Sequence, residues 1–179
     1  MTMIRSMSRR AFLPLFAGAA LSPAVLVPQQ ARAQGVSWQI YRPDGLGFEA
    51  EMPGEPKIKV EKGERDDVIV RAVDAEVDVD QITFGAYFQE VRKLLSMREE
   101  FLGQQLFARS IEGRVTREVA FTMNGFEGCE FTIESTVLNT IVRLVLVKNR
   151  RIALSAIGDR AVDGNAVVRR FLDSLKLVP

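Results

Sequence analysis

The fold of this chain is decided by residues 114–158, which read RVTREVAFTMNGFEGCEFTIESTVLNTIVRLVLVKNRRIALSAIG. Four runs of strand-forming residues follow one another here: Arg114–Met123, Phe126–Ser135, Val137–Val147 and Arg151–Gly158. The Asn-Gly pair at 124–125 and Lys-Asn-Arg at 148–150 are typical of the short connections between hairpin strands. The stretch therefore predicts a four-stranded antiparallel meander.

The second and third runs differ in how many faces they are expected to bury. In the second run, Cys129, Phe131 and Ile133 alternate with polar residues, as in a strand with one face on the core and one in water. In the third run, both the odd-numbered and the even-numbered positions are largely apolar, which favours a central strand covered on both faces. We thus expect a wet face on the second strand, carrying Glu130 and its polar neighbours.

The hairpin around 124–125 carries two conflicting signals. A two-residue Asn-Gly loop would set apolar Val119 opposite charged Glu130, whereas a slip of one residue would set it opposite Phe131. Opposed residues share a face of the sheet, and a one-residue slip turns the whole strand over, so burial should decide the register. We therefore expect a loop longer than two residues, or a bulge at Gly125 or Gly128.

Residues 1–33 have the features of an export signal. Arg9 and Arg10 lie in Ser-Arg-Arg-Ala-Phe-Leu at 8–13, which resembles the twin-arginine signal of bacteria. The moderately apolar run that follows is broken by two prolines and is too short for a transmembrane helix. Ala-Arg-Ala at 31–33 predicts cleavage by signal peptidase after Ala33.

These features predict a periplasmic protein, with a signal peptide at 1–33 and one domain at 34–179. Its expected first partners are the twin-arginine export machinery and signal peptidase; an ordinary Sec signal is the alternative. Residues 1–33 hold four basic and no acidic residues, so the 24 Lys+Arg fall to 20 against 23 Asp+Glu, a net charge of −3. That charge disfavours a nucleic-acid partner.

The rest of the mature chain predicts further strands and two helices. Strands are expected at 37–41, 48–52, 57–61, about 68–77 and 82–91. Ser96 and Glu99 form a capping-box pattern for a helix to about Ser110, with a stripe of Met97, Phe101, Leu102 and Leu106. A closing helix, with Asp163 as its cap, carries Val168, Phe171, Leu172 and Leu175 at helical spacing. The fold class is α+β: an antiparallel sheet of about seven to nine strands with two main helices packed on it.

The mature chain opens with four short motifs: Trp38-x-x-Tyr41, Pro43-Asp44-Gly45, Gly47-Phe48 and Met52-Pro53-Gly54-Glu55-Pro56. This opening resembles that of small exported PsbP-like domains. The order of strands, central helix, meander and closing helix across 37–177 is similar as well. The resemblance implies an antiparallel sheet flanked by helices and a role in assembly, stabilisation or binding. It carries over no functional residue, because the matching positions are turn formers and core aromatics.

Four carboxylates form the most prominent polar group: Asp74, Glu76, Asp78 and Asp80. They alternate with apolar residues and would lie on one side of an extended strand. Two neighbours could bridge a calcium ion at oxygen distances of about 2.4 Å, but four could not. A solvated strand face opposed by Lys57, Lys59 or Arg71 is the simpler interpretation. A basic partner is the first functional alternative, and a weak cation site is the second.

Candidate catalytic groups are scarce. The chain has no histidine, which removes the commonest general base and metal ligand. Cys129, the single cysteine, alternates with core residues and is expected to be inert. Trp38 and Tyr41 are expected to seal one end of the core; a ligand-stacking platform is the alternative. We expect no enzyme activity, no catalytic residue and no cofactor.

The sequence thus predicts an exported, non-catalytic binding or assembly-assisting module that acts on a periplasmic protein partner. The alternative is a small-ligand or divalent-cation binder with a pocket between helix and sheet. A carboxylate-based hydrolase is a third hypothesis. A pocket of a few hundred Å³ would favour the ligand binder, and an exposed apolar patch would favour the partner protein.

Overall fold

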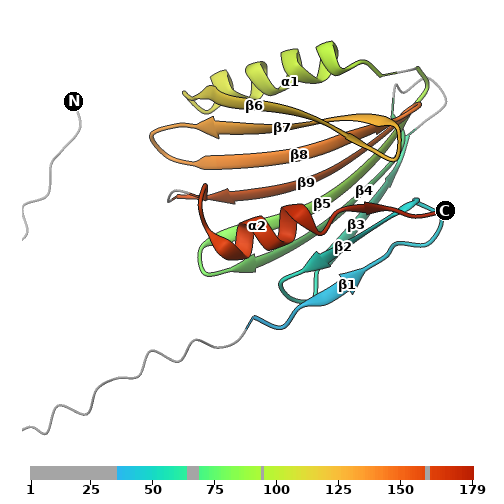
Figure 1. The fold of residues 1–179 in the computed structure, drawn as a ribbon, viewed down its shortest axis with the longest axis horizontal. Helices are drawn as coiled ribbons and strands as arrows, with labels where there is room; N and C mark the ends of the chain where they lie inside the picture. Colours follow the sequence, from blue (N-terminus) through green and yellow to red (C-terminus); the bar gives the residue numbers. More distant parts are fainter. Residues whose placement is uncertain (1–35, 64–68, 94, 160–161) are drawn as a thin grey trace, which may run out of the picture. The chain divides into compact units, whose positions relative to one another are not determined.

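The structure is a computed structural model, and it describes residues 36–63, 69–93, 95–159 and 162–179. In these ranges it has ten strands and two helices (Figure 1). The strands are β1 (Gln39–Tyr41), β2 (Phe48–Met52), β3 (Lys57–Lys62), β4 (Ile69–Val79), β5 (Ile82–Val91), β6 (Arg114–Met123), β7 (Phe126–Glu134), β8 (Asn139–Val147), β9 (Arg150–Gly158) and β10 (Lys176–Leu177). The helices are α1 (Met97–Ser110) and α2 (Ala166–Asp173).

The predicted meander is confirmed. The main sheet has seven strands in the order β3-β4-β5-β9-β8-β7-β6, and β6 to β9 pair antiparallel with their neighbours in sequence. β8 is buried on both faces, as its double apolar parity predicts. The antiparallel α+β class is therefore as expected.

The division into two sheets was not predicted. β1, β2 and β10 form a separate three-stranded sheet, so the described strands number ten in two sheets rather than seven to nine in one. The closing chain returns after α2 to pair Leu177 with Phe48. A two-residue strand such as β10 leaves no periodicity to read, which is why the sequence did not reveal it.

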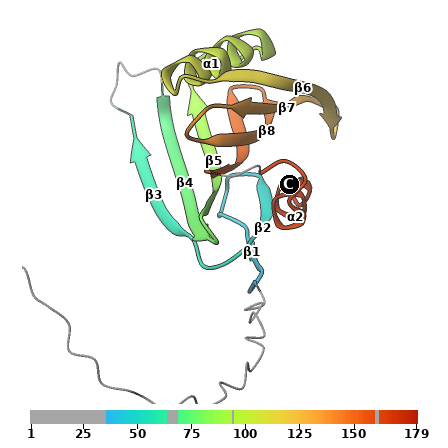
Figure 2. The ribbon, with the colours of Figure 1, turned by 90° about the vertical axis from the view of Figure 1, so that its left-hand side faces the viewer.

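The two helices cover opposite faces of the main sheet (Figures 1 and 2). Phe84, Phe88 and Leu154 point to the face that α2 and the small sheet cover. Phe131, Leu144 and Ala153 point to the face that α1 covers. Side chains alternate along a strand, so the strands of the meander supply both layers of core.

Helix α1 begins as predicted but turns a different side to the sheet. The Ser96–Glu99 capping box is present. However, the buried residues are Glu100, Gln104 and Ala108, whereas Leu102 and Leu106 are 50% and 65% exposed. Leu106 lies nine residues after Met97, which is half a turn away on a helix, so one stripe cannot include both. Met97 and Phe101 contact the core, and this orientation puts polar side chains over the sheet.

Helix α2 buries the predicted residues but has a different cap. Val168, Phe171, Leu172 and Leu175 are all buried. Asn165, not Asp163, is the N-cap, and its side-chain oxygen accepts hydrogen bonds from the backbone of Val167 and Val168. Asp163 lies one residue before the turn glycine Gly164, too far from the first helical turn to accept from its amides.

The predicted register of the β6–β7 hairpin was wrong. The loop is a two-residue Asn124-Gly125 turn with both residues at positive φ, and Val119 lies opposite Glu130. The irregularity in this ladder falls between Val115 and Arg117. The prediction failed because Glu130 is buried rather than wet, being only 6% exposed beneath α2.

Candidate functional site

A hollow with both apolar and polar lining residues lies between α1 and the middle of the main sheet. It has a volume of about 360 Å³. Its floor comes from β5, β9 and β8, and its roof comes from α1. We call it the α1 pocket; its lining residues are Tyr87, Gln89, Glu100, Gly103, Gln104, Phe107, Thr140, Val142, Arg151, Ala153, Ser155 and Ile157.

The lining combines apolar walls with polar groups on two sides. Val142, Ala153 and Ile157 supply apolar surface from the sheet, and Phe107 supplies an aromatic ring from the helix. Polar side chains come from the sheet as Gln89 and Arg151, and from the helix as Glu100 and Gln104. A concave, largely apolar site with a few convergent polar groups is the usual form of a small-molecule site.

Glu100 and Arg151 form an ion pair inside the α1 pocket. Oε2 of Glu100 lies 3.2 Å from Nε of Arg151, and the two side chains are 10% and 30% exposed. Arg151 also donates from Nη1 to Oε1 of Gln89 at 3.3 Å. Burial raises the pKa of Glu100, although the charge of Arg151 opposes that change. The pocket therefore holds one charge of each sign, and burial makes the ionised form of Glu100 costly.

Two hydroxyl groups in the pocket wall are buried. Thr140 Oγ1 has no hydrogen-bond partner within the part of the chain that the structure describes. Ser155 Oγ makes no hydrogen bond of good geometry there, but it lies close to the Tyr87 hydroxyl and acts to lower the pKa of that phenol, against the larger effect of burial. The Thr140 and Ser155 residues are 1% and 5% exposed. Buried polar groups are almost always satisfied, so unsatisfied ones beside a cavity are a feature of binding sites.

Tyr87 forms the side of the α1 pocket nearest β4. Its hydroxyl donates to Oε1 of Glu76 at 2.6 Å. Burial and the Glu76 carboxylate together hold the pKa of Tyr87 well above its ordinary range. The phenol therefore stays protonated and presents an uncharged surface to the pocket.

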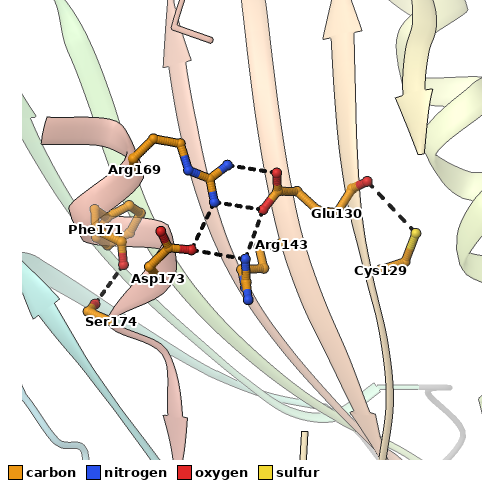
Figure 3. Close-up of polar contacts among 7 residues, drawn as sticks. All are labelled: Cys129, Glu130, Arg143, Arg169, Phe171, Asp173 and Ser174. Carbon is orange, nitrogen blue, oxygen red and sulfur yellow. Dashed lines mark hydrogen bonds and ion pairs between the residues drawn. The ribbon is translucent and has the colours of Figure 1, made fainter. Parts of the chain in front are cut away.

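A charged cluster on the other face of the sheet ties α2 down (Figure 3). Arg169 donates to both carboxylate oxygens of Glu130, at 2.7 and 3.1 Å, and Arg143 donates to Oε2 at 3.0 Å. Both arginines also reach Oδ1 of Asp173. A hollow of about 430 Å³ lies beside the cluster, but among its charged lining residues Arg143 and Arg169 are already paired with Glu130. The cluster thus links β7, β8 and α2.

The four carboxylates at positions 74, 76, 78 and 80 lie in part where the sequence predicts them. Asp74 lies opposite Lys59 and Glu76 opposite Lys57 across the β3–β4 ladder. Asp78 accepts a hydrogen bond from Thr83 at 2.6 Å. Asp80 is not on the strand, because it lies after the end of β4 with a φ of 50°. In the described residues, no three Asp, Glu or Cys side chains are grouped so that they could hold a metal ion.

The remaining candidates lie in the core. Cys129 is fully buried, and burial together with the nearby Glu118 carboxylate raises its pKa to about 11, so the thiol is inert at neutral pH. Tyr41 packs edge-on against Phe48 with ring centroids 6.1 Å apart. Trp38 packs against the same core, below the guanidinium of Arg170 at 4.1 Å. Neither aromatic residue lines the α1 pocket.

The export residues Arg9, Arg10 and Ala33 lie outside the described residues. Within the ranges that are described, neither helix has the length and apolar character needed to cross a membrane.

The residues of the α1 pocket were missed by reasoning from the sequence. The signal that could have revealed them is on β9, where the polar residues Arg151 and Ser155 lie on one face of a largely apolar, buried strand. A polar set facing inward on a buried strand predicts either a buried network or a site. On α1, Glu100 and Gln104 are four residues apart and share a face, which supplies the other side.

Comparison with known proteins gives no assignment. No family model matches the chain, and no curated protein matches it.

Proposed function

We propose that the protein binds a small organic molecule in the α1 pocket and does not transform it. The observation that carries this proposal is the buried Thr140 hydroxyl without a partner, together with the weakly engaged Ser155 hydroxyl, in the wall of a cavity of about 360 Å³. A bound molecule with hydrogen-bonding groups would satisfy polar groups that the protein leaves open. The lining residues of the pocket include no histidine and no cysteine, the side chains that most often act as general base or nucleophile.

Gly103 offers a direct test of the site. It lies in the pocket lining, and a Cβ built there meets no atom within 4 Å. Gly103→Trp should therefore fill the pocket without disturbing the fold, and Gly103→Ala is the matched control that leaves it open. Alanine and tryptophan both have a higher helix propensity than glycine, so neither variant should unfold.

The experiment is a fragment screen by ligand-observed NMR on the mature protein and both variants. We expect a set of fragments to bind the wild type and Gly103→Ala, and to lose binding to Gly103→Trp. Fragments that bind all three proteins equally would place the site elsewhere. A screen in which no fragment binds the wild type would refute the proposal.

A protein partner that docks on α1 is the second candidate function. Leu102 and Leu106 are 50% and 65% exposed on the outer side of this helix. Exposed apolar side chains gathered on one element are typical of an interaction surface. Leu106→Lys should weaken capture of such a partner while leaving fragment binding in the α1 pocket unchanged, because Leu106 does not line the pocket.

Both functions fit an exported domain of the PsbP-like kind. The features that support this classification are the motifs from Trp38 to Pro56 and the order of strands, central helix, meander and closing helix. Export to the periplasm through the twin-arginine route is part of the same proposal, and it rests on Arg9 and Arg10.

A further inference from the structure

We infer that the α1 pocket selects an uncharged molecule that carries hydroxyl groups and one apolar face, and that the Glu100–Arg151 pair rejects charged molecules. This inference rests on the proposed binding function of the pocket. It follows from the charges, the open hydrogen-bonding groups and the apolar walls that the pocket lining presents.

The charges in the pocket lining cancel one another. Glu100 and Arg151 are the carboxylate and the guanidinium among the lining residues, and they face each other at 3.2 Å. Glu76 lies behind Tyr87, which donates to it, and Lys57 lies opposite Glu76 on β3. A charged ligand would leave one charge without compensation in a partly buried site, where charges interact more strongly than in water. An uncharged ligand leaves the pair intact.

The hydrogen-bonding groups of the pocket are of both kinds. The hydroxyls of Thr140 and Ser155 can each donate and accept, and so can the amide of the buried Gln104. Hydroxyl groups on a ligand can do the same, so they match these partners in either direction. A ligand with acceptors alone could not pair with the carbonyl oxygen of Gln104, and a ligand with donors alone could not pair with its N–H groups.

The apolar part of the pocket determines the chemical character of the other half of the preferred ligand. Val142, Ala153 and Ile157 line the sheet side, and the ring of Phe107 lines the helix side. A flat apolar ring or chain between these surfaces would remove them from water, which favours binding. The preferred ligand therefore combines a hydroxylated edge with an apolar face.

The test uses three probes of one shape and different charge: 4-hydroxybenzyl alcohol, 4-hydroxybenzoate and 4-hydroxybenzylamine. Dissociation constants are measured at pH 7 by NMR titration of the mature protein. We expect the neutral alcohol to bind at least tenfold more tightly than either ion. Equal or tighter binding of one of the ions would overturn the inference.

Two variants test the role of the ion pair. Glu100→Gln keeps the shape of the side chain and leaves Arg151 without its carboxylate. The affinity for the benzoate should therefore rise at least tenfold relative to the affinity for the alcohol. Arg151→Gln should shift the preference toward the amine. Glu90→Gln is the matched control, because Glu90 pairs with Arg150 at 3.8 Å on the opposite face of the sheet. Loss of this carboxylate should leave the order of affinities for the three probes unchanged. The isosteric Glu100→Gln decides the question alone if Arg151→Gln does not fold.

The failures of the two proposals are distinguishable. If other fragments bind in a manner that Gly103→Trp blocks and none of the three probes binds, the binding function of the α1 pocket is supported and the inferred ligand class is wrong. If the probes bind and Glu100→Gln leaves the order of their affinities unchanged, the ion pair does not determine selectivity. If nothing binds the wild type, both proposals fail.

Discussion

Phe121 on β6 lies directly opposite Gly128 on β7, and its ring covers the backbone at that position. A Cβ built at Gly128 would lie 2.5 Å from Cε2 and Cζ of Phe121 and 2.9 Å from the carbonyl oxygen of Leu144. The guanidinium of Arg143 lies 4.5 Å from the centre of the same ring. Glycine at 128 therefore leaves room for the ring between the hairpin backbone and the guanidinium of Arg143.

Gly128→Ala should destabilise the domain by about 1–3 kcal/mol, because the added methyl group overpacks against both a side chain and a backbone carbonyl. The measurement is a urea melt followed by circular dichroism. Gly103→Ala is the control, since a Cβ at that helical position meets nothing within 4 Å and should not destabilise. Equal losses in the two variants would contradict the steric explanation.

The register of this hairpin shows where reasoning from the sequence stopped. The Asn124-Gly125 pair predicts a two-residue turn, and the structure has one. The opposite expectation came from treating Glu130 as solvent-facing. Its partners, Arg143 and Arg169, come from β8 and α2, at separations of 13 and 39 residues, and no local pattern indicates them. Strand positions were thus readable, but the burial of a charged residue was not.

Phe171→Ala should cost about 3–5 kcal/mol in the free energy of unfolding. Phe171 is fully buried, and its ring meets Phe84 edge-on at a centroid distance of 5.3 Å. Arg170→Ala is the neighbouring control: its side chain is 53% exposed and contacts Glu51 and Trp38, so its loss should cost less than about 1 kcal/mol. Comparable shifts of the urea midpoint would mean that the helix faces are assigned wrongly.

The candidate site was less predictable than the fold. The capping box fixed where α1 begins, but the apolar residues Leu102 and Leu106 suggested the wrong buried side. Packing of Phe101 against Phe131, with ring centroids 6.3 Å apart, determines the rotation of the helix instead. Such a contact joins elements far apart in the chain. Periodicity within α1 cannot reveal it, so Glu100 and Gln104 were not recognised as pocket residues.

Replacing both Arg9 and Arg10 with Lys should retain the precursor in the cytoplasm, because the twin-arginine pathway recognises the pair of guanidinium groups. The measurement is fractionation of cells that express the full chain, with immunodetection of the precursor and mature forms. Arg5→Lys, outside the Ser-Arg-Arg-Ala-Phe-Leu sequence, is the control and should leave export unchanged. Normal accumulation of the double variant in the periplasm would assign export to the Sec route.

Glu130→Gln should remove a pH-dependent part of the stability. Burial alone would raise the pKa of Glu130, but the bonds from Arg169 and Arg143 outweigh it and hold the pKa below its ordinary value of 4.5. A carboxyl with a lowered pKa in the folded state contributes stability above its unfolded pKa and loses it as the pH falls through the folded one. We expect Glu130→Gln to cost about 1–3 kcal/mol at pH 7, since two partly buried guanidinium groups lose a shared partner.

The same variant should cost progressively less as the pH falls from 7 toward 2, because the wild-type carboxyl is then protonated and the two proteins become alike in charge at this position. Urea melts at several pH values measure the difference. Glu127→Gln, an exposed change on the same strand, is the control and should shift stability by no more than about 0.5 kcal/mol at any pH. A constant difference between wild type and Glu130→Gln across this range would mean that the shape of the side chain, rather than its charge, holds α2 against β7 and β8.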